Sequence, residues 1–264
     1  MRWVIQKNLI NIEDHNKIRD ICLSHGYSHE SIDVVPFSPD IPAIDTDQLT
    51  VFYGATNFIN NIYLSKRWNP GTFFTENFTM RASTEHYKEH MINYPCEFST
   101  IREFSGSHQP MDKQFFIRPV KDLKEFTGEV MEFNKMVGWE RQLRYLPGCD
   151  NNPNLTLDTE ILVAEPCGIA HEWRAFVVNG MVSSGSHYRS YMHLDANKDF
   201  PQRVVDFVER MCEIWMPAPI FVMDIGESAG NLYIVECGCF NSAGFYKSDV
   251  EKIVVDISEF ITGC

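Results

Sequence analysis

Two carboxylates stand in one apolar hairpin in the last quarter of the sequence. Asp224 lies in the segment FVMDIG and Glu236 in LYIVECG, and the intervening ESAGN is a turn that would pair the two segments antiparallel. A carboxylate in an apolar strand needs a partner for its charge, and two adjacent carboxylates repel each other unless a cation lies between them. Mg²⁺ prefers such oxygen ligands, often together with substrate phosphates, and Asn241 could add a third oxygen. The hairpin is therefore a candidate metal site; the alternative is that one carboxylate forms a salt bridge or caps a helix and the other faces solvent.

Cationic side chains occur in or just after apolar segments upstream of this hairpin. They are Arg118 at the end of FFIRP, Lys121 and Lys124 in the loop that follows, Arg174 in HEWRAFVV and Arg189 in SGSHYRSY. Arginine binds phosphate through a planar fork, and lysine binds it as a point charge. Because the chain carries a formal net charge of -13, isolated cations in apolar strands indicate an anionic ligand. For any single one of them, a salt bridge with Glu172 or Asp195 is the alternative.

Composition limits the class of protein. The 264 residues suffice for one large domain or two small ones, and 44% of them are hydrophobic. No apolar run is long enough to span a membrane, and the first residues lack the apolar core of a secretory signal. We therefore expect a cytoplasmic protein whose eight cysteines are reduced. The acidic charge disfavours non-specific binding to nucleic acid and suits a metal-bound nucleotide or a basic protein partner.

The elements that must position these residues fall into two parts. Over residues 1–110, strand-like and helix-like segments alternate, which predicts a small open α/β domain. Within it SIDVVPF and CEFSTIREF are predicted strands, and STEHYKEHMIN is a predicted helix. The polar segment SGSHQPMDK, residues 105–113, is the expected linker to a second part, residues 111–264. That part should contain a hairpin around Asn179-Gly180 and helices over residues 126–139, 200–215 and 248–261.

Three motifs in the second part carry a family resemblance. In order they are FIRPVKDLKEFTG, EWRAFVVNGMVSSGSHYR and VECGCFNSAGFYKSD. Together they resemble the ATP-grasp superfamily over about residues 113–249, and more narrowly a divergent clade of phage and bacterial proteins that also contains the eukaryotic assembly factor for translation initiation factor two. The resemblance implies an α/β fold with α+β lobes, in which two ATP-grasp lobes meet at a hinge near residues 160–168 and follow a small α/β domain.

The resemblance also implies ATP and Mg²⁺ as cofactors and a role for each candidate residue. Arg118 and Lys124 would hold the nucleotide phosphates, and Arg174 and Arg189 would neutralise the transferred phosphoryl group, so that Lys124, Arg174 and Arg189 are the candidate catalytic residues. The hinge segment VAEPC would bind the adenine and ribose through Ala164, Glu165 and Cys167, and the metal ligands would be Asp224, Glu236 and Asn241. The implied reaction activates a carboxylate as an acyl-phosphate and joins it to an amine or a similar nucleophile.

Two departures from the family pattern bear on this assignment. The loop that covers the phosphates is usually rich in glycine, whereas PVKDLKEFTG has a single one. The usual Glu-x-Asn metal motif is replaced by Glu236-Cys237-Gly238, and Asn241 follows three residues later than expected. The alternative function is therefore an ATP-binding assembly or chaperone-like protein without ligase turnover.

Substrates and a remote alternative complete the sequence-based hypotheses. The carboxylate and amine substrates would be small molecules or peptides, and the acceptor site would include YGATNFINN, residues 53–61, unless its polar residues only cap a helix. The remote alternative is a zinc peptidase, because His86, Glu89 and His90 match the H-x-x-E-H pattern. The polar segment around that pattern favours a solvated helix face instead.

Overall fold

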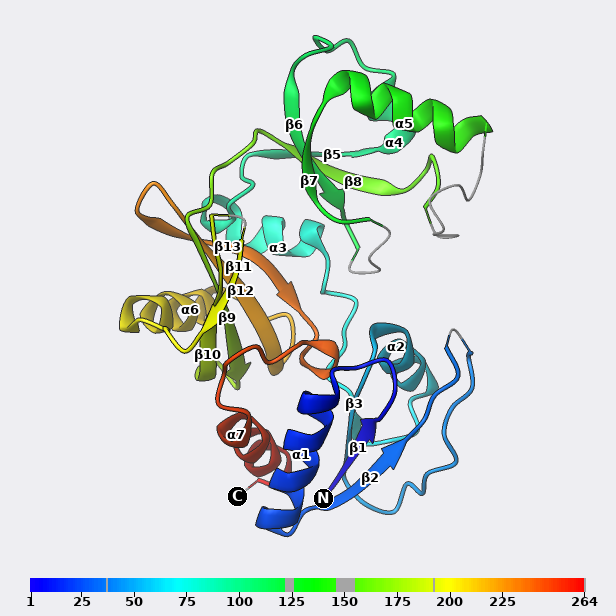
Figure 1. Ribbon diagram of the computed structural model, residues 1–264, viewed down its shortest axis with the longest axis vertical. Helices are drawn as coiled ribbons and strands as arrows, with labels where there is room; N and C mark the ends of the chain where they lie inside the picture. The colour runs from blue at the N-terminus through cyan, green and yellow to red at the C-terminus, as the bar shows by residue number, and fades with distance from the viewer. Residues whose placement is uncertain (37, 122–125, 146–154, 192, 264) are drawn as a thin grey trace.

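The structure, a computed structural model, describes residues 1–36, 38–121, 126–145, 155–191 and 193–263. Within these ranges three sheets follow one another along the long axis of the molecule (Figure 1). A parallel sheet lies at one end, a five-stranded antiparallel sheet in the middle and a four-stranded antiparallel sheet at the other end. This mixed architecture confirms the fold class expected from the sequence. No helix in the described ranges is long and apolar enough to cross a membrane.

The N-terminal part is the expected small α/β unit, with strand order β2-β1-β3-β4. Its elements are β1 (Arg2–Gln6), α1 (Ile12–His25), β2 (Ser28–Ile32), β3 (Thr50–Tyr53), α2 (Thr56–Ser65) and β4 (Pro70–Gly71). The Asn11 side chain caps the start of α1, and Gly26 ends it in the left-handed region, with φ 71°. The second strand lies earlier than SIDVVPF predicted, because its pairing with β1 begins at Ser28.

The small lobe contains the second sheet, with strand order β5-β8-β6-β7. Helix α3 (Met80–Tyr87) and a 3-10 turn (Lys88–His90) lead to its elements, which are β5 (Cys96–Thr100), α4 (Ile101–Ser105), β6 (Gln114–Pro119), β7 (Glu129–Glu132), α5 (Phe133–Tyr145) and β8 (Glu160–Ala164). The aromatic rings of Phe104, Phe115 and Phe133 pack edge to face in its core. The predicted helix over residues 126–139 begins only at Phe133, because the residues before it pair with β6 as β7.

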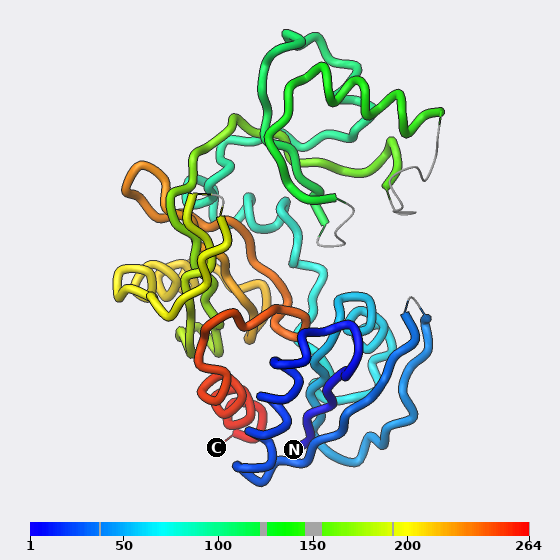
Figure 2. The backbone as a smooth tube through the Cα atoms, in the orientation of Figure 1, coloured from blue at the N-terminus to red at the C-terminus, as the bar shows by residue number. Residues whose placement is uncertain are grey.

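The boundary expected near residue 110 needs a correction. Strand β5 pairs antiparallel with β8 along its whole length, so residues 96–105 belong to the small lobe and not to the N-terminal unit. The segment 105–113 therefore joins α4 to β6 inside one lobe. Figure 2 shows the backbone crossing between this lobe and the central sheet in two places, before β5 and after β8. The second crossing begins after Ala164, the last residue of β8, so it includes residues 165–168 of the segment in which a hinge is predicted.

The central sheet forms the large lobe, with strand order β11-β10-β9-β12-β13. Its elements are β9 (His171–Val178), β10 (Met181–Ser190), β11 (His193–Asn197), α6 (Gln202–Ile214), β12 (Ile220–Ser228), β13 (Asn231–Gly238), a 3-10 turn (Phe240–Ser242) and α7 (Val250–Thr262). Both predicted hairpins are confirmed, and Asn179 and Gly180 take the positive φ values, 49° and 85°, that a two-residue turn between twisted strands requires. The apolar side of α6 packs on one face of the sheet.

The opposite face of the central sheet shares its core with the N-terminal unit. Phe176 of β9 and Ile220 of β12 pack with Trp3 of β1 and with the apolar side of α7. The Trp3 Nε1 donates to Ser258 Oγ on α7 at 3.1 Å, and α1 lies beside α7 (Figure 1). The first and last helices of the chain therefore meet, and they close the N-terminal unit against the large lobe.

Candidate functional site

The arginines and carboxylates that the sequence singled out lie side by side on the central sheet. In the pairing register, Asp224 of β12 is opposite Arg174 of β9 on one side and Glu236 of β13 on the other. Directly opposite residues in antiparallel strands present their side chains on the same face of the sheet. The hairpin thus does bring its two carboxylates together, as expected. It also places an arginine beside them.

Arg174 and Asp224 form a buried, bidentate ion pair. Arg174 Nε donates to Asp224 Oδ1 at 2.8 Å, and Nη2 donates to Oδ2 at 2.7 Å. The side chains are only 14% and 3% exposed. Burial raises the pKa of Asp224, the nearby Glu236 and Glu172 carboxylates add to this, and Arg174 opposes it. Burial acts to lower the pKa of Arg174, but the Asp224 carboxylate outweighs that effect and leaves the pKa above its usual value.

Two further arginine–carboxylate pairs surround this one. Arg118, at the end of β6 in the small lobe, reaches across to Glu236 and also donates to the Val235 carbonyl at 3.4 Å. Arg189 of β10 lies 3.2 Å from Glu172, which also accepts a hydrogen bond from Tyr188 at 2.7 Å. Of the salt bridges with Glu172 or Asp195 that the sequence left open as an alternative, the one between Arg189 and Glu172 is formed, whereas Arg118 and Arg174 pair with the two hairpin carboxylates. The Arg118 pair also connects the two lobes.

Two of these arginines retain polar atoms without a partner. The Nε atoms of Arg118 and Arg189 are buried and make no hydrogen bond among the described residues. A buried N–H without an acceptor is costly, and a phosphate oxygen would satisfy it. The residues present therefore fit a metal-bound nucleotide, since carboxylate oxygens suit Mg²⁺ and the guanidinium groups suit phosphate.

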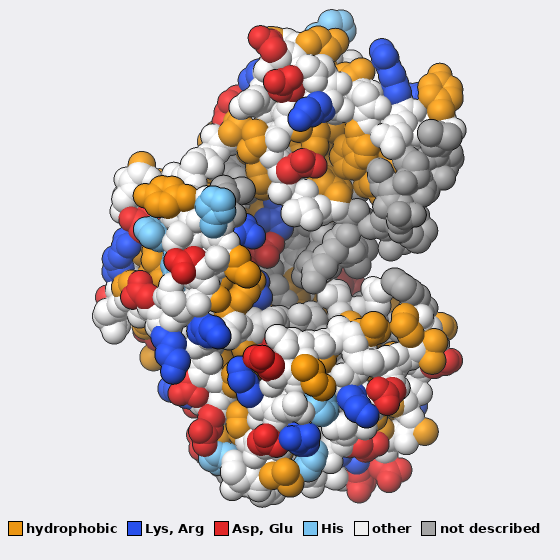
Figure 3. Space-filling view, in the orientation of Figure 1, with side chains coloured by type: hydrophobic (Ala, Val, Ile, Leu, Met, Phe, Trp, Pro, Cys, Tyr) orange, Lys and Arg blue, Asp and Glu red, His pale blue; other side chains and the backbone are white. Residues whose placement is uncertain are grey.

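A cavity of about 320 Å³ adjoins Arg118 and Glu236, and its other lining residues are Pro119, Lys121, Phe126, Thr127 and Gly128. Figure 3 shows this face hollowed between the small lobe and the rest of the molecule, with basic and acidic side chains along the hollow. The packing at Gly128 is close, because a Cβ at this position would lie 3.0 Å from the Arg118 Cβ and 3.1 Å from the Phe116 ring, and these neighbours would have to shift to admit it. The single glycine of the segment PVKDLKEFTG therefore lies in the wall of this cavity. Lys124, predicted to contact the phosphates, lies outside the described residues.

The hinge residues lie where β8 leaves the small lobe. Ala164 is the last, buried residue of β8, and Glu165 is exposed and paired with Lys113, with Nζ and Oε1 3.0 Å apart. Cys167 is exposed, and its Sγ lies 3.1 Å from the Ser228 hydroxyl at the end of β12. These three residues therefore lie in the segment that leads from the small lobe to the large lobe, and their contact with adenine and ribose stays a prediction.

Asn241 lies in a different environment from the one a metal ligand requires. Its side chain is fully buried; Oδ1 accepts from the Phe73 N–H at 2.8 Å, and Nδ2 donates to the Phe52 carbonyl at 2.7 Å. This corrects the expectation that it joins Asp224 and Glu236, because the 3-10 turn after β13 directs it into the N-terminal unit. In the part of the chain that the structure describes, no group of three or more His, Cys, Asp or Glu side chains is arranged to hold a metal ion.

The polar residues of YGATNFINN do not cap their helix. Helix α2 begins at Thr56 after Ala55, and no side chain caps it. The Ala55 N–H instead donates to Gln6 Oε1 at 2.8 Å, and the Gly54 N–H donates to the Asn241 carbonyl at 2.9 Å. The capping alternative is therefore wrong, and the acceptor role of this segment stays a prediction.

The H-x-x-E-H pattern does not form a zinc-binding face. Helix α3 ends at Tyr87, and Lys88 adopts a positive φ of 49°, so His86 and His90 are not on successive turns of one helix. His86 instead stacks on Trp215, with ring centroids 4.3 Å apart. The geometry gives no support to the peptidase alternative.

Aromatic residues at the centre of the site were missed in the sequence. The rings of Tyr188 and Tyr246 stack with centroids 4.9 Å apart, and the Arg174 guanidinium lies 5.1 Å from the Tyr246 ring. These rings cover one side of the Arg174–Asp224 pair and help to keep water away from it. The sequence did contain a signal for them, because Tyr188 lies in the motif EWRAFVVNGMVSSGSHYR and Tyr246 lies in the motif VECGCFNSAGFYKSD.

The chain resembles several solved structures along its whole length. It superimposes on D-cycloserine synthetase DcsG with a TM-score of 0.64 at 12% identity, covering 99% of this chain and 100% of that one. A RimK domain ATP-grasp protein from Sphaerobacter thermophilus gives a TM-score of 0.63 at 12% identity, with 100% of both chains covered. The ATP-grasp ligase PsnB, in complex with its minimal precursor, gives 0.58 at 10% identity, covering 99% of this chain and 98% of that one. At these identities the likeness is one of fold.

Sequence comparison identifies the family. Among curated protein sequences none matches this one. The sequence pattern of the ATP-grasp domain, R2K clade family 2, matches residues 95–255, which begin just before β5 and end within α7. This region contains both lobes and every residue of the three ion pairs. Because the match covers more than half of the sequence, the chain belongs to the ATP-grasp domain family, R2K clade family 2.

Proposed function

We propose that this protein is an ATP-dependent ligase that activates a carboxylate as an acyl-phosphate and joins it to an amine or a similar nucleophile. The observation that carries the proposal is the group of three arginine–carboxylate pairs on the central sheet, Arg174–Asp224, Arg189–Glu172 and Arg118–Glu236, the last of which connects the two lobes. These side chains contain the positive groups that phosphoryl transfer needs and the carboxylates that a magnesium ion needs. Because the reaction consumes ATP, the proposed location is the cytoplasm.

The proposed roles combine the family resemblance with the positions of the side chains that the structure describes. Arg118, with Lys124 in the loop after it, would hold the phosphates, and Ala164, Glu165 and Cys167 would contact the adenine and ribose. Asp224 and Glu236 would hold Mg²⁺, which neutralises phosphate charge when bound, and its remaining ligands would be phosphate oxygens and water. Arg174 and Arg189 would stabilise the negative charge that develops on the transferred phosphoryl group. The chain contributes positioning and charge rather than acid–base chemistry.

The pairing of the side chains predicts that metal and nucleotide bind together. A nucleotide without metal would have to take arginines away from Asp224 and Glu236 and would leave two carboxylates unpaired beside its phosphates. A metal-bound nucleotide supplies a new partner to both kinds of side chain at once. We therefore expect a non-hydrolysable ATP analogue to bind with a micromolar Kd in the presence of Mg²⁺ and much more weakly without it.

Calorimetric titration of the purified protein with that analogue, with and without Mg²⁺, tests the proposal. Glu236→Gln should weaken binding about tenfold or more in the presence of Mg²⁺ and change it little without the metal. The matched control is Glu227→Gln, on the same hairpin, because Glu227 pairs with Arg203 at 2.6 Å outside the site. Equal effects of the two substitutions, or no binding in any condition, would count against the nucleotide site.

A turnover assay separates a ligase from a protein that only binds ATP. Pairs of carboxylates and amines, free or in peptides, are screened for release of ADP. Release that depends on both members of a pair supports the ligase. Tight binding of the analogue together with an absence of ADP release across the screen would favour the alternative, an ATP-binding assembly protein.

A further inference from the structure

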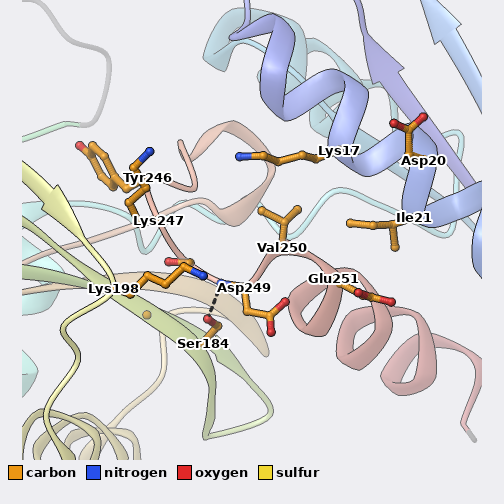
Figure 4. A pocket seen from close by; sticks show the side chains of 12 residues that line it. Lys17, Asp20, Ile21, Ser184, Lys198, Tyr246, Lys247, Asp249, Val250 and Glu251 are labelled. Atoms are coloured by element: carbon orange, nitrogen blue, oxygen red, sulfur yellow. Dashed lines mark hydrogen bonds between the residues drawn. The ribbon is translucent and has the colours of Figure 1, made fainter.

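A further cavity lies outside the hollow between the lobes. It has a volume of about 730 Å³ and opens between α1, β10 and the segment that leads into α7 (Figure 4). Lys17 reaches it from α1, Lys198 from the segment after β11, and Lys247 from the segment before α7. Figure 4 shows these lysines approaching one space from separate elements of the chain.

Three lysines and three carboxylates line this pocket, and they differ in their partners. Lys17, Lys198 and Lys247 form no ion pair among the described residues, although the chain has 36 acidic residues against 23 basic ones.

The acidic residues of the lining, in contrast, are all engaged by neighbours. Asp20 pairs with Arg19 at 2.8 Å, Glu251 lies 2.9 Å from His25, and the Asp249 side chain caps α7 by accepting from the Lys252 N–H at 3.1 Å. Of these carboxylates only Asp20 has an arginine as its partner, whereas the partner of Glu251 is a histidine and that of Asp249 is a backbone N–H, which leaves its charge in place. The three lysines are the positively charged groups of the lining, they have no ion-pair partner among the described residues, and they are the groups available to an anionic ligand.

Packing holds the walls of the pocket in place. Phe200 lies directly against Gly185 of β10, where a Cβ would come within 2.3 Å of its ring, and this contact anchors the segment that carries Lys198. The Ser184 hydroxyl accepts from the Asp249 N–H at 2.9 Å and so ties β10 to the start of α7. The lysines are thus attached to a preformed frame, which reduces the entropy lost when they bind a ligand.

One residue joins this pocket to the proposed reaction site. Tyr246 lines the pocket, and its ring lies 5.1 Å from the Arg174 guanidinium. Arg174 is in turn paired with Asp224, which is opposite Glu236 in the sheet. A ligand in the pocket would therefore have one end close to the group that is proposed to stabilise the transferred phosphoryl group.

We propose that this pocket binds a ligand that carries two or more carboxylate groups, and that this ligand is a substrate; the second part rests on the proposed ligase function. Three lysines on separate segments suit several separate single charges. A compact phosphate group is bound better by the planar fork of arginine, which the pocket lining lacks. The carboxylates could belong to a small polycarboxylate or to a glutamate-rich peptide.

Calorimetry without nucleotide tests the pocket on the full chain. The probes are citrate, a triglutamate peptide and the uncharged triglutamine peptide, in a buffer of low ionic strength. The variant is Lys17→Gln with Lys198→Gln and Lys247→Gln. The control is Lys7→Gln with Lys66→Gln and Lys135→Gln, which removes the same charge from exposed lysines that also lack an ion pair among the described residues.

We expect citrate, triglutamate or both to bind, triglutamine not to bind, and the pocket variant to bind about tenfold more weakly, because the substitutions remove three exposed positive charges, each of which contributes modestly. The control variant should stay within about twofold of the unmodified protein. Binding of citrate alone assigns a free polycarboxylate, and binding of triglutamate alone assigns a peptide. The proposal is overturned if neither probe binds at millimolar concentration, or if both variants lose affinity equally.

Titration of the pocket variant with the ATP analogue and Mg²⁺ keeps the two proposals apart. The pocket lysines do not line the cavity at Arg118, so nucleotide affinity should be retained. If carboxylates bind the pocket while the nucleotide does not bind the unmodified protein, the pocket stands and the ligase proposal falls. If the nucleotide binds and the carboxylates do not, the nucleotide site stands and the pocket proposal falls.

Discussion

At the scale of single residues, the buried pair between Arg174 of β9 and Asp224 of β12 has a large desolvation cost. Removing two charges from water costs several kcal/mol for each, and only a close, bidentate contact offsets most of that cost. Arg174 and Asp224 make such a contact, and the stacked Tyr188 and Tyr246 rings shield it. The presence of this pair therefore says little about the stability of the protein. It indicates instead a site whose charged side chains are held in position to bind a ligand.

We expect Asp224→Ala to lower the free energy of unfolding by about 3–5 kcal/mol, because it leaves the buried Arg174 without a partner. The double variant Arg174→Leu with Asp224→Leu should recover most of that loss, since no buried charge remains. Chemical denaturation measures both. Glu227→Ala is the control, because its partner Arg203 is 49% exposed and the change should cost no more than about 1 kcal/mol. A double variant as unstable as the single one would contradict this account.

Cysteine reactivity gives a second prediction at this scale. Burial raises the pKa of the Cys22 and Cys212 thiols to about 12, so at pH 8 they remain protonated and unreactive. Cys167 is exposed at the hinge. We expect an alkylating reagent to modify Cys167 well before these two, and the ATP analogue with Mg²⁺ to slow that modification.

Mass spectrometry of the alkylated peptides follows each thiol separately. Cys22 and Cys212 serve as internal controls, and their modification reports unfolding. If the nucleotide binds and yet leaves the rate at Cys167 unchanged, the proposed contact between the hinge and the adenine is not supported.

At the scale of elements, the turn after β13 serves to join two sheets. Asn241 bonds to the backbone of Phe52 in β3 and to that of Phe73 just after β4. The loop that follows the proposed metal carboxylates is thus attached to the N-terminal unit, on which an acceptor substrate is proposed to lie. Asn241 therefore affects the site indirectly. The hydrogen bonds of its side-chain oxygen and nitrogen fix this loop in place.

We expect Asn241→Ala to lower the free energy of unfolding by about 2 kcal/mol or more, because it leaves a buried N–H and a buried carbonyl without partners. The affinity for the ATP analogue with Mg²⁺ should change little in the protein that remains folded. Denaturation and calorimetry check the two parts, and Asn231→Ala, at the exposed hairpin turn, is the control. A large loss of metal-dependent affinity at unchanged stability would restore Asn241 as a metal ligand.

At the scale of the whole molecule, the N-terminal unit and the large lobe share one hydrophobic core. The apolar side of α7 is buried between β1, α1 and the central sheet, and Ile253 and Ile257 are fully buried there. The small lobe has its own core around Phe104, Phe115 and Phe133. This division favours movement of the small lobe about its two connections rather than movement of the N-terminal unit.

Ile257→Ala should therefore destabilise the N-terminal unit and the large lobe together, by about 2–5 kcal/mol, because it opens a cavity in their shared core. Hydrogen exchange followed on peptides from β1 and β10 should show equal losses of protection. Ile261→Ala, on the same helix but only partly buried, should have a smaller effect. Loss of protection in β1 alone would mean that the two parts unfold separately.

Local features of the structure could be predicted from the sequence because their causes are local. The Asn179-Gly180 turn sets a two-residue hairpin through its own positive φ values, and the apolar spacing of residues 204–212 sets the buried side of α6. The paired carboxylates could be recognised for the same reason, since a short turn connects their two strands. The family match covers residues 95–255, which include the three motifs, and it confirms the ATP-grasp family that they resemble.

Contacts between distant segments decided what the sequence left open. Strand β5 belongs to the small lobe only because β8, some sixty residues later, pairs with it, and Arg118 meets Glu236 only because two lobes face each other. The direction of the Asn241 side chain depends on β3, far earlier in the chain. The sequence shows which residues are apolar or charged. Which strand pairs with the edge of another strand, and which side chain pairs with a buried charge, depends on how the whole chain packs.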